Sequence, residues 1–160
     1  MKLQEVSDVQ QAERLSCFFV DNIPENYVSS GDVAYGRADA SFRLALDLRQ
    51  VIQQELSDII SGNVPNKKVL TGIVDEHVIG LAIIAINDGT GTLEDLVIDR
   101  SARGKGYGKS MLALINEVFR DNAVTTVFLE SGVDNNDAHR FFTGQGFKPA
   151  GLLFVKPLQS

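Results

Sequence analysis

The sequence is poor in the residues that build disulfides and metal sites. It has one cysteine, Cys17, and two histidines, His77 and His139, among 160 residues. A single cysteine excludes an intramolecular disulfide, and two histidines far apart in the sequence make a poor metal site. We therefore expect no metal ion. Cys17, within Cys17-Phe18-Phe19-Val20, is read as a buried apolar side chain.

Long apolar runs and an excess of positive charge are also missing. Nowhere do about 18 apolar residues follow one another, and the N-terminus lacks the layout of a signal peptide. We expect a cytoplasmic protein with no membrane partner. The net charge of −6 argues against nucleic acid as the main partner, because a phosphate backbone calls for clustered Lys and Arg. The same charge favours cationic partners.

The residues that are present fit one folded domain over 1–160. Apolar residues make up 44% of the chain and charged residues 22%, which are ordinary values for a globular protein. Apolar positions at helical spacing predict a helix over 8–20 and a longer helix from Phe42 to about Ile60. The stretch 21–40 between these helices is irregular.

From residue 68 onward the apolar pattern changes to that of strands. Strands are predicted over 69–74, 77–86 and 92–98. They are followed by a helix over 107–120, a strand over 124–130, a short helix over 136–144 and a final strand over 152–156. Antiparallel strands followed by a strand–helix–strand crossover predict an α+β fold with a mixed, mostly antiparallel sheet and flanking helices.

A basic, glycine-rich segment joins the third of these strands to the helix that follows it. The segment is Arg100-Ser-Ala-Arg-Gly-Lys-Gly-Tyr-Gly-Lys109, with four positive charges, three glycines and no acid. The N–H groups at a helix start have no partner within the helix, and the positive end of the helix favours anions. Together with the Arg and Lys side chains, these groups predict a site for a phosphorylated ligand.

Two common phosphate-binding motifs do not describe this loop. Gly108-Lys109-Ser110 matches the end of a Walker A motif, but Arg103 stands where that motif needs its first glycine. The glycines at 104, 106 and 108 also have the wrong spacing for a dinucleotide fingerprint. A glycine-rich helix start with a solvated basic edge is the plain structural alternative.

The loop and a second motif together resemble a known family. The first motif is a strand that bears Glu94-Asp95-Leu96-Val97-Ile98, followed by Arg103-x-x-Gly106-x-Gly108. The second is Asn135-x-x-Ala138-x-x-Phe141-Phe142-x-x-x-Gly146-Phe147. Both resemble the acetyl-CoA-binding core of the GNAT superfamily of N-acetyltransferases. The resemblance covers about residues 68–157 and leaves 1–67 as helices on the side of the acceptor.

The resemblance implies that acetyl-CoA is the cosubstrate. Backbone amides of the loop would bind its pyrophosphate, and the strand before the loop would pair with its pantetheine arm. Arg103, Lys105 and Lys109 would meet the ribose phosphate, with Lys105 read mainly as a solvated charge. Asn135 would contact the arm or cap the following helix. The implied set is Leu96, Val97, Ile98, Arg103, Gly104, Lys105, Gly106, Tyr107, Gly108, Lys109, Asn135 and Phe142.

The resemblance also implies direct transfer of the acetyl group to a primary amine. Adjacent strand residues face opposite ways unless a bulge intervenes, so Glu94 and Asp95 are expected to do different jobs. Glu94 is predicted to be the general base, and Asp95 an electrostatic contact for the amine. A backbone N–H near Val97 is expected to hold the oxyanion. The alternative is that one or both acids are surface charges on a strand.

One residue departs from the family pattern. Phe142 stands where many members carry a tyrosine that protonates the leaving thiolate, and Tyr107, Ser131 or a water are its candidate replacements. A non-catalytic CoA-binding regulatory module of the same fold is therefore the alternative function. Phe142 favours that alternative, whereas the Glu94-Asp95 pair opposes it. Dimers are common in the family, so a homodimer stays open.

The acceptor is usually bound by the N-terminal segment in this family, and here that segment is acidic. The irregular stretch 21–40 contains carboxylates and tyrosines that suit a cationic amine, through ion pairs or through the ring faces. They are Asp21, Glu25, Asp32, Asp39, Tyr27 and Tyr35. The plain alternative is a solvated acidic surface.

Overall fold

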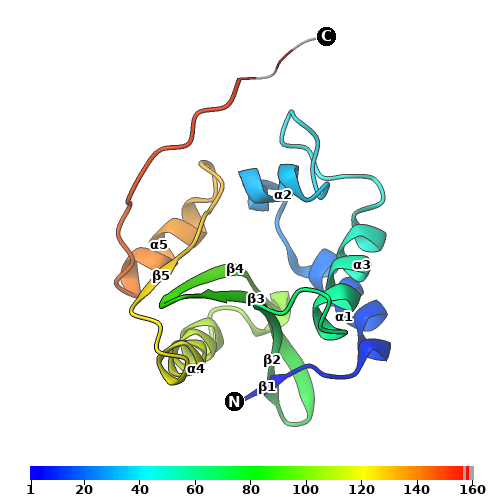
Figure 1. Cartoon of the computed structure of the whole chain (residues 1–160), viewed down its shortest axis with the longest axis vertical. Coiled ribbons are helices and arrows are strands. Elements are labelled where there is room, and N and C mark those ends of the chain that lie inside the picture. The colour runs from blue at the N-terminus through cyan, green and yellow to red at the C-terminus, as the bar shows by residue number, and fades with distance from the viewer. Residues whose placement is uncertain (157, 159–160) are drawn as a thin grey trace.

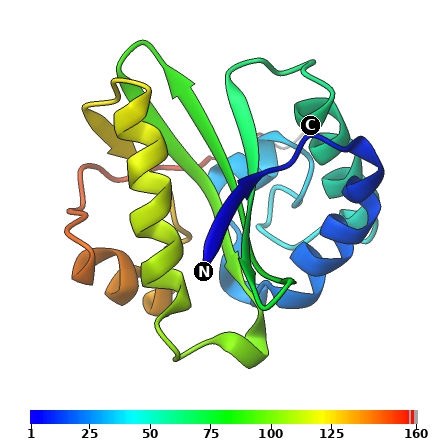
Figure 2. The same cartoon turned by 90° about the horizontal axis from the view of Figure 1, so that it is seen from below.

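A computed structural model describes residues 1–156 and 158, and it places one sheet between two layers of helices (Figure 1, Figure 2). Helices α1 (Ala12–Asn22) and α3 (Leu48–Ile60) cover one face, and α4 (Tyr107–Asp121) covers the other. The shorter helices are α2 (Ser30–Ala34) and α5 (Asn136–Gly144), and the 3-10 turns are η1 (Val9–Gln11), η2 (Glu25–Tyr27) and η3 (Arg100–Ala102). No helix among the described residues has the length and apolar character needed to span a membrane.

The sheet of the described residues has five strands in the order β1-β2-β3-β4-β5. The first three pairings are antiparallel, and β4 and β5 pair in parallel. The strands are β1 (Lys2–Glu5), β2 (Lys67–Val74), β3 (His77–Asn87), β4 (Thr90–Ile98) and β5 (Thr126–Phe128). The predicted α+β fold with a mixed, mostly antiparallel sheet is confirmed.

Each face of the sheet carries its own apolar core. Successive side chains of a strand point to opposite faces, so each central strand contributes to both cores. The helices supply apolar residues three and four apart, which lie on one side of a helix. The strand residues that pack against α1 and α3 include Leu81, Ile83 and Val97, and those that pack against α4 include Ala82, Ile84 and Leu93.

The expected longer helix over 42–60 is wrong in its first turns, because α3 begins only at Leu48. Asp39 uses its carboxylate to accept hydrogen bonds from the backbone N–H groups of Ser41 and Arg43, at 2.8 and 3.1 Å. Phe42 then adopts a φ of 60°. A side chain that captures nearby backbone donors competes with helix formation, and a left-handed residue stops it.

The ends of the chain also differ from expectation. β1 was missed, because its four residues are mostly exposed and show no apolar alternation. The expected final strand over 152–156 is wrong, because this segment has no ladder partner among the described residues and extends away from the sheet (Figure 1). Leu152 and Phe154 are 86% and 88% exposed. The expected boundary at Pro157 lies outside the described residues.

Replacement of Gly91 by alanine is expected to destabilise the fold. A Cβ at Gly91, on β4, would lie 2.5 Å from Cε1 of the buried Phe119 of α4. Overpacking of a core costs about 1–3 kcal/mol. Urea denaturation of Gly91→Ala should show that loss in the free energy of unfolding. Gly144→Ala, where a Cβ meets open space, is the control and should stay within about 1 kcal/mol of the wild type. Equal stability of Gly91→Ala and wild type would contradict the packing described here.

Candidate active site

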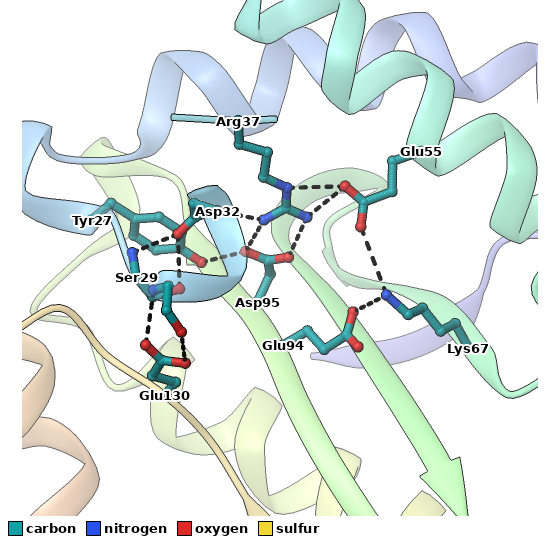
Figure 3. Close-up of polar contacts among 10 residues, drawn as sticks. Tyr27, Ser29, Asp32, Arg37, Glu55, Lys67, Glu94, Asp95 and Glu130 are labelled. Carbon is teal, nitrogen blue, oxygen red and sulfur yellow. Dashed lines mark hydrogen bonds and ion pairs between the residues drawn. The ribbon is translucent and has the colours of Figure 1, made fainter. Parts of the chain in front are cut away.

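A β-bulge in β4 brings two acidic residues to the same face of the sheet. Ile83 pairs with Asp95 and Ile84 pairs with Leu93, so Glu94 is an extra residue without a ladder partner. An extra residue interrupts the alternation of side chains. Glu94 therefore points to the α3 side of the sheet, as Asp95 does, and contacts Lys67 of β2 there (Figure 3). The bulge is the condition under which neighbouring acids can serve one site.

The second half of β4 has an open edge. β4 and β5 pair only from Thr90 to Thr92, and beyond this point β4 has no partner on that side among the described residues. Asp99 N donates to Ile79 O of β3 at 2.9 Å, so alternation directs the N–H groups of Leu96 and Ile98 away from β3. The N–H of Val97 faces β3 by the same rule. An oxyanion at this open edge would therefore reach the N–H of Leu96 or Ile98, the two neighbours of Val97.

The glycine loop after β4 presents backbone donors that have no partner among the residues that the structure describes. Gly104 and Gly106 have φ angles of 74° and 83°, which a residue with a side chain rarely adopts. Gly106 caps α4, and the first bond within the helix is from Ser110 N to Gly106 O at 3.0 Å. The N–H groups of Tyr107, Gly108 and Lys109 precede that bond, and the first turn carries no acid. These donors and the open space around both glycines fit a pyrophosphate.

Arg103 is placed differently from the other basic residues of the loop. Its Nε donates to Ile98 O at 3.1 Å, and its guanidinium also donates to Asn22 O at the end of α1. Arg100 donates to Ile23 O at 2.8 Å in the same region. The two arginines thus tie the loop to α1. Lys105 and Lys109 are exposed at the loop surface.

The second motif lies on α5 and the segment before it. Asn135 is buried, and its Oδ1 accepts a hydrogen bond from Ala138 N at 3.3 Å, which is the capping geometry considered for this residue. Phe142 packs edge-on against Phe141 and Phe147. Ser131 Oγ is buried and has no hydrogen-bond partner among the described residues. A ligand that enters between β4 and α5 would meet these groups.

Two pockets meet at Glu94. The α5-side pocket has a volume of about 60 Å³ and is bounded by Leu96, Ser131, Asn135 and Phe142. The α2-side pocket has a volume of about 190 Å³ and is bounded by Gly31, Tyr35, Arg37 and Thr92. Both are lined by Ser29, Asp32, Leu93, Glu94 and Glu130. The open edge of β4 thus leads to Glu94, whose carboxylate also lines the α2-side pocket.

A buried arginine organises the wall behind these pockets (Figure 3). Arg37 donates to Asp32 Oδ1 at 3.1 Å, to both carboxylate oxygens of Asp95 at 3.1 and 2.9 Å, and to Glu55 Oε2 at 2.9 Å. Its guanidinium also lies 5.3 Å from the ring centre of Phe19. Burial alone would lower the pKa of Arg37, but the carboxylates around it, Asp95 first, raise it well above its usual value. The cation therefore joins α2, α3 and β4.

Asp95 is a member of this buried cluster and does not line either pocket. Its side chain has 0% exposure, and Tyr27 donates a hydrogen bond of 2.8 Å to its Oδ1. Burial and the Asp95 carboxylate raise the pKa of Tyr27 well above 10. The expected contact of Asp95 with the amine therefore does not fit the structure, because both of its oxygens are already bound by Arg37 and Tyr27.

Glu94 is accessible, but it has a partner. Lys67 Nζ lies 2.7 Å from Glu94 Oε2 and 4.0 Å from Glu55 Oε1. It also lies 4.6 Å from the ring centre of Tyr35. Burial alone would lower the pKa of Lys67, but the hydrogen bond and charge of Glu94 raise it. The ammonium group of Lys67 thus occupies the place where a cation pairs with Glu94.

Sequence reasoning missed Arg37, Glu55, Lys67 and Glu130. Glu130 accepts hydrogen bonds from Ser30 N and Ser30 Oγ at 2.8 and 2.7 Å, which joins α2 to the segment after β5. The sequence offered one signal for such residues. A charged residue that stands among apolar residues on one face of a helix or strand indicates a buried charge with a partner. Glu55 and Lys67 fit that description, because each lies beside the buried positions of α3 and β2.

The acidic stretch 21–40 contributes only in part. Asp32, Tyr27 and Tyr35 line the pockets. Asp39 instead holds its own turn through Arg43, and Asp21 of α1 lies 3.9 Å from Arg49 of α3, where both side chains are exposed. Neither of these two residues lines the α5-side or the α2-side pocket, and neither does Glu25. The acidic surface around them is the plain alternative considered for this stretch.

Comparison with known proteins identifies the family of this chain. A model of the Acetyltransferase (GNAT) family matches residues 40–147, which is more than half of the chain. The chain belongs to this family. The resemblance read from the two motifs is thereby confirmed, and the GNAT match also takes in α3, which neither motif includes.

Two curated N-acetyltransferases match part of this GNAT chain. The uncharacterized N-acetyltransferase YhdJ of Bacillus subtilis (strain 168) is 40% identical over 67 residues, 41% of this chain and 47% of that protein. The aminoalkylphosphonate N-acetyltransferase of Salmonella typhimurium is 31% identical over 68 residues, 42% of this chain and 44% of that protein. The chain thus spans about half the length of the curated relatives that it matches.

A solved structure shows the same fold over nearly the whole chain. A tetramutant of the BH1408 protein from Bacillus halodurans superposes with a TM-score of 0.75. The superposition covers 99% of this chain and 100% of that one, at 18% sequence identity. At this identity the likeness concerns the fold alone.

Loss of the Arg37 cation is expected to be severely destabilising. Arg37→Met leaves Asp32, Glu55 and Asp95 buried without their shared partner, and removal of one partner from a buried ion pair costs about 3–5 kcal/mol. Denaturant unfolding should show this loss. Arg43→Met, which breaks only the exposed pair with Asp39, is the matched control and should lose far less. Similar losses in the two variants would mean that the cluster is not the anchor described here.

The stability contributed by Glu55 should depend on pH. Burial, only partly offset by Arg37, raises the pKa of Glu55 above its ordinary value of 4.5. The folded state then holds a proton that the unfolded state has lost, so this contribution is complete below about pH 4.5 and disappears as the pH rises through the folded pKa. The free energy of unfolding of the wild type, minus that of Glu55→Gln, should fall over this range. A difference that rises with pH would refute the assignment.

Proposed function

We propose that this protein is an N-acetyltransferase that transfers the acetyl group of acetyl-CoA to a primary amine, with Glu94 as the general base. The position of Glu94 carries the proposal. It is the bulge residue of β4, it is partly exposed, and it lines both the α5-side and the α2-side pocket. A group at that junction would lie between a thioester on one side and an amine on the other.

The residues of the loop and of β4 are suited to hold the cosubstrate. The free N–H groups of Tyr107, Gly108 and Lys109 would bind the pyrophosphate, and Lys105 and Lys109 are exposed nearby. The open edge of β4 from Leu96 to Ile98 would pair with the amide groups of the pantetheine arm. Phe142 and Asn135 would line the arm from the side of α5. Acetyl-CoA supplies an activated acyl group with a thiolate as leaving group.

Glu94 would act as the base that takes a proton from the ammonium group of the acceptor. An alkylammonium with a pKa near 10.4 must lose a proton before attack, which costs about 5 kcal/mol at neutral pH. The Glu94 carboxylate, directly or through a water, would take that proton as the amine nitrogen bonds to the carbonyl carbon. The N–H of Leu96 or Ile98 would stabilise the oxyanion. The carbon–sulfur bond then breaks, and its electron pair leaves with the sulfur.

The charge of the α2-side pocket supports a cationic acceptor. Asp32, Glu94 and Glu130 line it together with the ring of Tyr35, and Arg37 is its only cation among the described residues. Such a wall favours an ammonium group and disfavours an acceptor with a second, anionic group. The similar aminoalkylphosphonate N-acetyltransferase acts on a compound that carries a phosphonate. We therefore propose amines without an anionic group for this protein.

The test is thiol release from acetyl-CoA with polyamines, aminoglycosides, amino acids and short peptides as acceptors. Glu94→Gln is expected to lower kcat about 100-fold or more, the ordinary effect of losing a general base. Glu117→Gln, on the exposed side of α4, is the control and should match the wild type. Wild-type activity in Glu94→Gln would exclude Glu94 as the base. Tight binding of acetyl-CoA without turnover on any amine would instead favour the regulatory CoA-binding module.

A further inference from the structure

The ammonium group of Lys67 lies in a cage that would recognise any alkylammonium. A carboxylate of Glu94 at 2.7 Å, a carboxylate of Glu55 at 4.0 Å and the ring of Tyr35 at 4.6 Å surround it. Carboxylates and aromatic ring faces are the groups that bind ammonium ions in proteins. The side chain of Lys67 is only 10% exposed, so the chain fills this cage with its own cation.

The cage has a second, unused position for the same cation. Glu55 Oε2 is bound by Arg37, whereas Glu55 Oε1 is buried and has no hydrogen-bond partner among the described residues. It lies 4.0 Å from Lys67 Nζ, just beyond hydrogen-bond distance. A buried carboxylate oxygen without a partner is costly, and the raised pKa of Glu55 reflects the same cost. A small movement of Lys67 Nζ would satisfy it.

We propose that Lys67 is a specificity-determining residue that pairs with Glu94 in the free protein and moves to Glu55 when the ammonium group of the acceptor takes its place. The inference rests on the proposed function, since it concerns the same Glu94. The two ammonium groups compete for one carboxylate, and Glu55 receives the one that is displaced. Two cations, Arg37 and Lys67, face four carboxylates in this cluster, so a further cation is electrostatically favourable.

This exchange decides which acceptors are bound. A neutral ligand brings no charge to replace the one that leaves Glu94, and an anion would add to the excess of carboxylates. An alkylammonium replaces the ammonium group of Lys67 with a group of the same charge, and it brings the reacting nitrogen to Glu94, the proposed base. Lys67 thus selects for charge, whereas the shape of the pocket selects for size.

Steady-state kinetics with the best acceptor tests the role of Lys67. The KM for the acceptor should increase from Lys67→Met through the wild type to Lys67→Arg, an order that a purely structural role of Lys67 would not produce. Lys67→Met removes the competitor, so the KM for the acceptor should fall about three- to tenfold, with kcat within about twofold. Lys67→Arg binds carboxylates in a bidentate manner and is harder to displace, so its KM should rise. Lys68→Met, which loses only an exposed pair with Glu5, is the control and should match the wild type. A higher KM for Lys67→Met than for Lys67→Arg would overturn the proposal.

The role of Glu55 is tested by combination. Glu55→Gln keeps an oxygen for Arg37 but removes the second carboxylate partner of Lys67, so the KM for the acceptor should rise. In Lys67→Met there is no ammonium to receive, and the same substitution should change the KM by less than about twofold. An equal rise in both backgrounds would show that Glu55 acts independently of Lys67 and would overturn the exchange.

A measurement without turnover separates this inference from the proposed function. In protein with ¹³C-labelled lysine, the Lys67 Cε signal, identified by its absence in Lys67→Arg, should shift as propylammonium chloride is added. It should not shift with potassium chloride at equal ionic strength, and the Lys68 signal should respond to neither. A Lys67 signal unmoved by propylammonium overturns the exchange, even if amines are acetylated. A specific shift in a protein that acetylates no amine supports the exchange and defeats the proposed function.

Discussion

The bonds of Arg37 to three carboxylates are the interaction on which the site depends. Asp32, Glu55 and Asp95 come from α2, α3 and β4, so one buried cation joins three separate elements. Charges so deeply buried persist only when every one has a partner. The cluster therefore ties α2 and α3 to β4, in addition to the apolar core that α3 shares with the sheet. It also fixes the wall of the pocket in which the acceptor is proposed to bind.

The bulge in β4 adds an accessible carboxylate, that of Glu94, to this wall. Without the extra residue, Glu94 would point toward α4 and into an apolar core, where an unpaired carboxylate is costly. With it, Glu94 joins Asp95 on the polar face but stays accessible, because Arg37 and Tyr27 bind Asp95 and leave Glu94 to Lys67. Two adjacent acids thus have different roles. Asp95 lies inside the buried cluster, and Glu94 lies at the pockets in contact with Lys67.

Much of the fold follows from local pattern. Alternating apolar residues in 69–98 and helical spacing in 107–120 state which elements form, because those periods match the geometry of strands and helices. The apolar pattern gives a wrong prediction where side-chain hydrogen bonds stop a helix or where an apolar segment stays exposed. Asp39 turns the chain although the helical spacing of apolar residues begins at Phe42. The apolar residues 152–155 have no strand beside them in the described part of the chain. The spacing of apolar residues shows which side of a helix or strand is apolar, but it does not show whether another element packs against that side.

The sequence by itself determined the family, the glycine loop and the acidic pair, because each depends on residues close together in the chain. Two short motifs were enough to indicate the GNAT fold that the family match confirms. Only the tertiary structure decided that Asp95 belongs to Arg37, 58 positions away, and that Lys67 lies between Glu94 and Glu55. These contacts join residues that are far apart in the sequence, and they depend on which charged side chains the fold buries next to one another. The spacing of residues along the chain therefore does not predict them.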